Sequence, residues 1–302
     1  MQNEKENKTD CSPEQCESCA EASCASRSHA APQHAAPVQD DTRLKARLNR
    51  IRRKIIVMSG KGGVGKSTVA VNLAMSAMLA GQRVGLLDVD LHGPSVPTML
   101  GLVGCRMEGG VDGMLPVEVG GLKVLSTGFL LQNDDDPVIW RGPMKMGVIR
   151  QFIEDVAWGD LDLLVIDVPP GTGDEPLSIC QLIPDLEGAV IVTTPQKVAA
   201  ADVRKSINFC NEVGVKVLGV IENMSGFACP KCGEVTPILR ANGGRTMAEE
   251  MGVPFLGSIP IDPLIAESGD DGKAFVESAA SSPAAGAFRE IVRELALGEK
   301  SA

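Results

Sequence analysis

The sequence predicts an α/β fold built on a doubly wound, mostly parallel sheet with flanking helices, and two patterns lead to this prediction. Short runs rich in β-branched residues alternate with longer segments of helical periodicity, and several of the short runs are apolar at nearly every position. Such runs suit parallel strands that helices cover on both faces. Ligands in this architecture bind at the carboxyl ends of the strands, so functional residues are expected in the loops there.

The expected elements begin with a strand at residues 54–59, a glycine-rich turn and a helix from residue 66 to about residue 80, which ends at Gly81. Further strands are expected, in chain order, at residues 83–88, 122–126, 161–167, 189–194, 215–222 and 255–259. The region 101–121 is rich in glycine and is expected to be irregular. The start of the chain lacks sustained periodicity, so we expect a flexible, cysteine-containing tail at residues 1–45 and a folded domain at 46–302.

Charge and hydropathy disfavour two classes of partner. The formal net charge is −10, which argues against a surface that neutralises nucleic-acid phosphates or anionic lipid. The chain has no apolar run of about 18 residues, and its first residues are polar where a signal peptide needs an apolar segment. We therefore expect a cytoplasmic protein without nucleic-acid or membrane partners.

The nine cysteines favour metal ligands or reduced core thiols over a disulfide framework, because cytosolic thiols are kept reduced. Three of them are isolated and are expected to pack as small apolar residues: Cys105, Cys180 and Cys210. The other six form two clusters, which are the N-terminal group Cys11, Cys16, Cys19 and Cys24 and the late pair Cys229 and Cys232. These two clusters are the candidate metal ligands.

A phosphate-binding loop is predicted directly after the first strand, where the sequence fits G-x-x-x-x-G-K-[ST] and opens a helix. The glycines let backbone N–H groups surround phosphate oxygens, and the helix N-terminus adds partial positive charge. Lys66 is expected at the β- and γ-phosphates, and the Ser67 hydroxyl is expected to bind Mg²⁺. The predicted nucleotide-binding residues of this loop are Gly60, Lys61, Gly62, Gly63, Val64, Gly65, Lys66, Ser67 and Thr68.

Hydrolysis of the nucleotide also needs carboxylates around Mg²⁺ and the attacking water, and two predicted strand ends carry them. Asp88 and Asp90 lie at one end, and Asp167 lies at the other, where an apolar run passes into VPPGTGD. An aspartate at the end of a strand can also serve only as a turn or cap former, and this alternative stays open for Asp88 and Asp90.

The K-G-G-x-G-K-[ST] form of the loop resembles the deviant Walker A class that includes MinD, ParA, ArsA and the nitrogenase iron protein. Further blocks resemble, in order, the Mrp/ApbC/Ind1 branch of cluster-carrier ATPases, over residues 51–261: DVDLHGPS, WRGPM, DVPPGTGDEPLSICQ, TTPQ and ENMSGFACPKCG. One departure is His92, where members of this branch often carry Tyr. The resemblance implies a MinD-like P-loop NTPase fold for residues 46–302.

The resemblance also implies roles for individual residues. Lys61 reaches the nucleotide of the facing subunit, which implies an ATP-dependent homodimer, and Lys61, Lys66 and Asp90 are the implied catalytic residues. Asp167 holds the Mg²⁺ shell through water, Asp90 orients or activates water, and Asp88 serves structure or Mg²⁺. Asn223 is placed where class members read adenine with a carboxamide, although it could also simply cap a turn.

The pair Cys229 and Cys232 has the C-x-x-C spacing for one metal centre but forms only half of a site. Two chains around a two-fold axis would bring four thiolates together. The family resemblance implies a bridging [4Fe–4S] cluster, whereas the ligand count alone also allows zinc. The four N-terminal cysteines have a different spacing from the N-terminal cluster of cytosolic relatives, and we expect a cluster, zinc or no metal there.

These features together predict an ATP-binding, slowly hydrolysing carrier that binds a [4Fe–4S] cluster and transfers it to apo-proteins. The alternative is a positioning ATPase of the MinD/ParA kind with a structural zinc site. A third candidate is an ATP-driven reductase, although the cysteine spacing of the nitrogenase iron protein differs.

Overall fold

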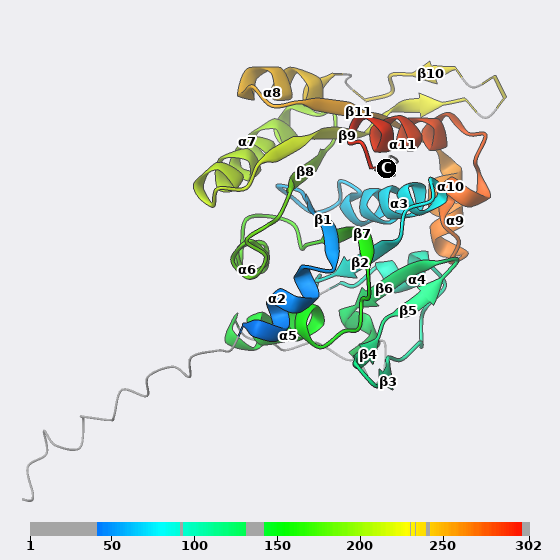
Figure 1. Cartoon of the computed structure of the whole chain (residues 1–302). Helices are drawn as coiled ribbons and strands as arrows, with labels where there is room; N and C mark the ends of the chain where they lie inside the picture. The colour runs from blue at the N-terminus through cyan, green and yellow to red at the C-terminus, as the bar shows by residue number, and fades with distance from the viewer. Residues whose placement is uncertain are drawn as a thin grey trace, which may run out of the picture. The chain divides into compact units, whose positions relative to one another are not determined.

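The centre of the molecule is a parallel sheet whose strands coincide with the apolar runs of the sequence (Figure 1). The computed structural model describes residues 41–90, 93–130, 142–229, 231–232, 234–239 and 242–297. The predicted N-terminal ligands Cys11, Cys16, Cys19 and Cys24, and also His92, lie outside these residues.

Nine strands of the described residues form this sheet, and eight of them follow the order β10-β9-β8-β1-β7-β2-β6-β5. The ninth strand, β11, pairs with β9 on the edge opposite β8. All neighbours are parallel except β5 and β10. β1 lies between β7 and β8, so chain connections run outward from it in both directions. The strands are β1 Ile51–Met58, β2 Val84–Asp88, β5 Val117–Val119, β6 Leu122–Ser126, β7 Leu161–Asp167, β8 Gly188–Thr193, β9 Val217–Ala228, β10 Val235–Thr236 and β11 Phe255–Ile261.

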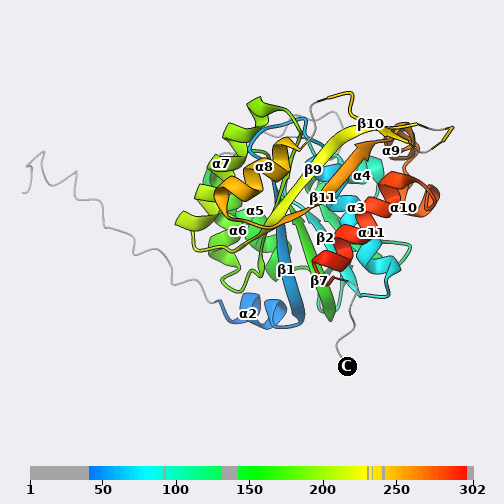
Figure 2. The same ribbon diagram turned by 90° about the horizontal axis from the view of Figure 1, so that it is seen from above.

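Helices cover both faces of the sheet, as Figure 2 shows from above. On one face lie α3 (Lys66–Leu79), α4 (Val96–Met99), α9 (Pro263–Asp270), α10 (Phe275–Ser278) and α11 (Pro283–Glu294). On the other lie α5 (Gly142–Glu154), α6 (Asp174–Leu182), α7 (Lys197–Glu212) and α8 (Gly243–Met251). The central strands are therefore buried on both faces, which explains their continuous apolar runs. None of the helices in the described part of the chain combines the length and apolarity needed to cross a bilayer.

The predicted doubly wound sheet is confirmed, and the differences lie at its margins. The region 101–121, expected to be irregular, contains the hairpin β3 (Glu108–Gly110) and β4 (Gly113–Leu115) and the edge strand β5. These strands are short and carry glycine, so they lack the alternation that marks longer strands. Strand β9 continues past Glu222 to Ala228, and helix α2 (Thr42–Leu48) begins before the expected domain boundary.

A buried lysine joins α2 to the sheet. Lys54 on β1 is only 1% exposed, and its Nζ donates to the carbonyl oxygens of Leu48 (3.1 Å) and Ile51 (2.6 Å). The same Nζ forms an ion pair of 2.7 Å with Asp185, whose side chain is exposed. The ammonium group thus satisfies carbonyls at the turn between α2 and β1.

We expect Lys54→Met to lower the free energy of unfolding by about 3 kcal/mol, because buried carbonyls and an ion pair lose their partner while the apolar stem is kept. Urea unfolding followed by circular dichroism measures this loss. The neighbouring Arg52 is exposed on the same strand, so Arg52→Met should change stability by no more than about 0.5 kcal/mol. Equal losses in the two variants would contradict the assignment.

Candidate nucleotide and metal site

The predicted phosphate loop connects β1 to α3 and has the backbone that its glycines allow. Gly65 precedes the first helical residue with φ 77°, a left-handed conformation that favours glycine, and a β-carbon there would collide with Asn223 Nδ2. A β-carbon at Gly60 would collide with the backbone of Asp202 on α7. The loop therefore lies so close to Asn223 and Asp202 that Gly65 and Gly60 leave no room for a side chain.

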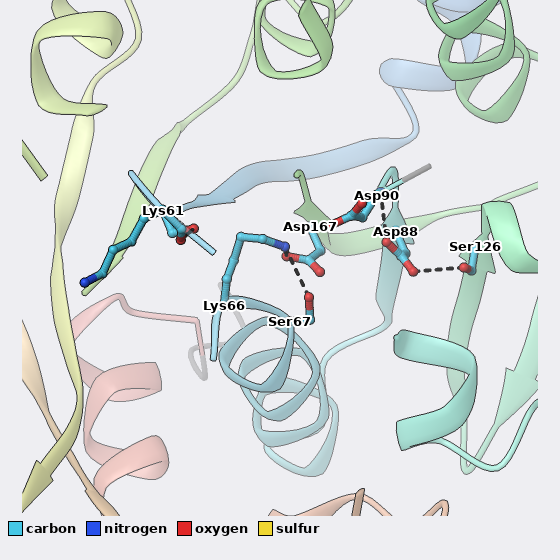
Figure 3. Close-up of polar contacts among 8 residues, drawn as sticks. Lys61, Lys66, Ser67, Asp88, Asp90, Ser126 and Asp167 are labelled. Carbon is cyan, nitrogen blue, oxygen red and sulfur yellow. Dashed lines mark hydrogen bonds and ion pairs between the residues drawn. The ribbon is translucent and has the colours of Figure 1, made fainter. Parts of the chain in front are cut away.

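The carboxyl edge of the sheet brings one lysine and two carboxylates together below this loop (Figure 3). Lys66 Nζ forms an ion pair with Asp167 at the end of β7 and donates to Ser67 Oγ at 3.1 Å. Asp88 ends β2, where it lies directly opposite Asp167 in the parallel register. Both carboxylates are fully buried and Lys66 is nearly so. Buried charges in this number need a compensating cation or proton.

The excess of buried negative charge affects the pKa of Asp88 most clearly. Burial, and secondly the neighbouring Asp167 carboxylate, raise the pKa of Asp88 to about 8. Burial also raises the pKa of Asp167, but Lys66 opposes that effect. Asp88 Oδ1 accepts a hydrogen bond from the Asp90 amide at 3.0 Å, and Oδ2 accepts one from Ser126 Oγ at 2.9 Å. Without a further cation, Asp88 is thus largely protonated at neutral pH.

These residues fit a magnesium ion that shares its ligands with phosphate. Asp167 Oδ2 is buried and accepts no hydrogen bond from the described part of the chain. In the same part of the chain, no group of three or more His, Cys, Asp or Glu residues could hold a metal ion by itself. Mg²⁺ commonly binds one or two carboxylates and completes its shell with water and substrate phosphates. Two acidic side chains and the Ser67 hydroxyl are what such a shared shell requires.

Two adjoining hollows lie over this cluster. The smaller, about 270 Å³, is lined by the phosphate loop from Lys61 to Thr68 except Val64, and by Asp90 and Pro170. The larger, about 550 Å³, is mostly apolar and is lined by residues of α3, α4, β11 and α9 and by Asn223. Gly65, Thr68, Ser95 and Met99 border both hollows. Their combined size suits a nucleotide with its phosphates in the smaller hollow and its base in the larger.

Asn223 lies in the middle of β9 and faces the phosphate loop, and its adenine-reading role stays a prediction. Its Nδ2 donates to the carbonyl oxygen of Val64 at 2.8 Å, and the residue is 6% exposed. Sequence reasoning missed several residues of the larger hollow, including Met224, Pro260, Ile261, Asp262 and Phe275. The signal that could have found three of them is the end of β11, because its carboxyl end lies at the same edge as those of β1 and β7.

Lys61, the second lysine of the loop, is not part of the buried cluster. Its side chain lines the smaller hollow but extends away from Lys66 and Asp167, as Figure 3 shows. The structure thus brings together Lys66, Ser67, Asp88, Asp90 and Asp167 and leaves Lys61 at the border.

The pair Cys229 and Cys232 occupies the tip of the hairpin formed by β9 and β10. The Cys229 amide donates to the carbonyl oxygen of Glu234 at 2.9 Å, which closes the turn, and Cys232 is exposed. Hydrogen bonds from the backbone of Lys231 and Cys232 lower the pKa of the Cys229 thiol. Donors that stabilise a thiolate favour metal binding, and two thiols give half of a four-sulfur site.

Comparison with known proteins identifies the family. A family model described as "ParA: NUBPL iron-transfer P-loop NTPase" matches residues 50–296. The chain belongs to this family of iron-transfer P-loop NTPases. An "Iron-sulfur cluster carrier protein" of Methanocaldococcus jannaschii is 51% identical over 78% of the chain and 81% of the relative. A "Cytosolic Fe-S cluster assembly factor NUBP2 homolog" of Trichoplax adhaerens is 49% identical over 82% of the chain and 95% of the relative.

Solved structures agree with this fold. A nucleotide-binding protein of Archaeoglobus fulgidus in complex with ADP matches with TM-score 0.70 and 41% identity over 78% of the chain and 93% of that protein. MinD of Pyrococcus furiosus matches with TM-score 0.58 and 24% identity over 81% of the chain and 98% of that protein, which shows the fold alone. The predicted family and the predicted P-loop fold are therefore both confirmed.

Since the folded state keeps a proton on Asp88 up to about pH 8, it binds more protons than the unfolded chain above the ordinary carboxyl pKa. The free energy of unfolding contributed by this group therefore falls as pH rises from about 4 to 8. We expect Asp88→Asn to stabilise the magnesium- and nucleotide-free protein relative to wild type by at least about 1 kcal/mol more at pH 8 than at pH 5.

Thermal and urea unfolding in EDTA at the two pH values measures this difference. Asp162→Asn is the matched control, because Arg83 lowers the pKa of Asp162 to about 2 and its titration lies below this window. Its effect on stability should be the same at pH 5 and pH 8. A parallel pH response in Asp88→Asn and wild type would contradict the burial argument.

Proposed function

We propose that this iron-transfer NTPase is an ATP-binding, slowly ATP-hydrolysing carrier that binds one [4Fe–4S] cluster between two identical chains and transfers it to apo-proteins. One combination carries the proposal: a full set of phosphate-binding and acidic residues in each chain stands beside only half of a metal site. Each chain carries the residues that bind the nucleotide and its magnesium, whereas the cysteine site needs the thiols of a second copy.

The nucleotide chemistry follows from the residues at the carboxyl edge. Lys66 exchanges its ion pair with Asp167 for the β- and γ-phosphates, which leaves Asp167 free to hold the magnesium shell through water. Magnesium supplies charge neutralisation and a fixed geometry for the phosphates. Asp90 borders the hollow that the phosphates would fill, and it orients the attacking water. Asn223 and the apolar hollow beside it receive the adenine.

The cargo chemistry follows from the hairpin. A cluster held by Cys229 and Cys232 of two chains lies on the two-fold axis, so opening the dimer exposes it to a recipient. Because Cys232 is exposed and Cys229 is partly so, an apo-protein can reach the sulfurs. The bound γ-phosphate closes the dimer and hydrolysis loosens it, which makes ATP a switch for cluster release.

Location and partners follow the same chemistry. Several relatives carry "cytosolic" in their names, and we propose the cytoplasm here because free thiols persist in that compartment. Recipient apo-proteins and a second copy of the chain are the proposed partners, and nucleic acid and membrane are not. The alternative, a positioning ATPase with a structural zinc, rests on the MinD-like fold and on the fact that four thiolates also suit zinc.

The decisive variant is Cys229→Ser with Cys232→Ser. After anaerobic reconstitution with iron and sulfide, wild type should hold one more four-iron cluster per dimer than the variant, because each chain contributes half the thiolates. Iron, acid-labile sulfide and visible absorbance per chain measure the difference. Cys180→Ser is the control, since burial raises the pKa of that thiol to about 11 and it should leave the cluster content unchanged.

If the double variant Cys229→Ser/Cys232→Ser holds as much cluster as wild type, the bridging site is wrong. Zinc without sulfide in wild type would favour the alternative.

The proposed role of Lys61 has its own test. In protein without iron or sulfide but with Mg²⁺ present, ATP should shift wild type from monomer to dimer, and Lys61→Ala should stay monomeric while its affinity for ADP changes by no more than about threefold. Size-exclusion chromatography with light scattering measures the mass. Lys205→Ala removes an exposed lysine of α7 and should dimerise like wild type. An ATP-dependent dimer of Lys61→Ala would show that the lysine does not act across the interface.

A further inference from the structure

Two hydroxyl residues lie under the loop that carries Asp88 and Asp90, and the proposed function does not use them. Ser126 ends β6 and Thr127 opens the short 3₁₀ helix η2 (Thr127–Leu130). Ser126 is fully buried and Thr127 is 1% exposed. Buried hydroxyl groups need hydrogen-bond partners, and both of these donate to the segment 88–90.

Ser126 is committed to Asp88. Its Oγ donates to Asp88 Oδ2 at 2.9 Å and accepts the amide N–H of Gly128 at 3.2 Å. The second contact fixes the hydroxyl, so its single proton is directed at the carboxylate. The pairing also follows from the sheet, because Ser126 and Asp88 are opposite residues in the parallel register of β6 and β2.

Thr127 is committed to Asp90. Its Oγ1 donates to the Asp90 carbonyl oxygen at 3.1 Å, while the Asp90 amide donates to Asp88 Oδ1 at 3.0 Å. Both backbone polar groups of Asp90 are therefore held, one by Asp88 and one by Thr127. These two hydrogen bonds fix the Asp90 backbone and thereby orient its side chain toward the smaller hollow.

Neither hydroxyl borders either hollow, since β6 lies one strand beyond β2 from the phosphate loop. We propose that Ser126 and Thr127 are positioning residues for magnesium–nucleotide binding: Ser126 orients the Asp88 carboxylate directly, and Thr127 fixes the Asp90 backbone, whose amide holds Asp88 Oδ1. This proposal rests on the proposed function, in which Asp90 orients the attacking water, and on the fit of Asp88 and Asp167 to a magnesium shell described above.

The test compares the affinity for a fluorescent ADP analogue in EDTA and in Mg²⁺, for wild type, Ser126→Ala and Thr127→Val. Removal of a group that orients a metal ligand lowers metal affinity by about 10- to 100-fold. We therefore expect the Mg²⁺-dependent gain in ADP affinity to fall by about tenfold in each variant, while the affinity in EDTA stays within about twofold of wild type. The Mg²⁺ concentration at half-maximal binding should rise in parallel.

Two further variants separate positioning from plain structure. Thr127→Ser keeps the hydroxyl and should keep the wild-type response to Mg²⁺. Ser76→Ala removes a buried hydroxyl on α3 that has no partner among the described residues, so it should match wild type throughout. If Ser126→Ala is too unstable to assay, the contrast between Thr127→Val and Thr127→Ser decides by itself.

An unchanged response to Mg²⁺ in both deletion variants would overturn the proposal while leaving the proposed function intact. A loss of ADP affinity that is equally large in EDTA would overturn it too, because the hydroxyls would then support only the fold. If wild type itself gains nothing from Mg²⁺, the proposed nucleotide chemistry fails together with this inference. The binding assay requires no hydrolysis, so a protein without ATPase activity still gives a result.

Discussion

The burial of two carboxylates and one lysine at the carboxyl edge of the sheet is the constraint on which the rest of the site depends. Asp88 and Asp167 lie opposite each other on neighbouring strands, and Lys66 forms its ion pair with Asp167. One cation against two buried carboxylates is electrostatically incomplete, so the free protein keeps a proton on Asp88. Asp88 and Asp167 would hold a divalent ion bound together with a nucleotide, Asp88 would then give up its proton, and Lys66 would be free to contact phosphate. The unbalanced cluster therefore favours a ligand that carries both metal and phosphate.

Strand β9 links this cluster to the cysteine hairpin. Asn223 contacts the phosphate loop through the Val64 carbonyl, and the same strand reaches Ala228 just before Cys229. Between them, Met224 has φ 58° and lines the larger hollow, so the strand bends where the nucleotide would sit. A non-glycine residue in this conformation costs free energy, which is characteristic of functional sites. A nucleotide that moves Asn223 or Met224 thus acts on the strand that positions the thiols.

Sequence reasoning reached the fold and most of the site because both depend on short-range patterns. The strand ends that carry Asp88 and Asp167 could be read from apolar runs, and the phosphate loop could be read from its spacing. What it missed depends on register. That Ser126 lies opposite Asp88 follows from which strands are neighbours, and β2 is separated from β6 in the chain by 33 residues that include α4, the hairpin of β3 and β4, and β5. That Pro260 and Phe275 line the larger hollow follows from where β11 and α10 lie in the fold. Nothing local in L-K-V-L-S marks its last residue as a partner of a carboxylate.

The extended strand β9 ends next to Cys229, which places the C-x-x-C pair at the tip of a hairpin. In C-x-x-C knuckles that bind metal within one chain, a second pair of thiols comes from elsewhere in the fold, but the described residues hold no such pair near the hairpin. The remaining described cysteines lie elsewhere, and burial raises the pKa of Cys180 and Cys210, which disfavours the thiolate. Under the proposed function, a symmetric copy of the hairpin would supply the two thiols that the other described cysteines do not offer.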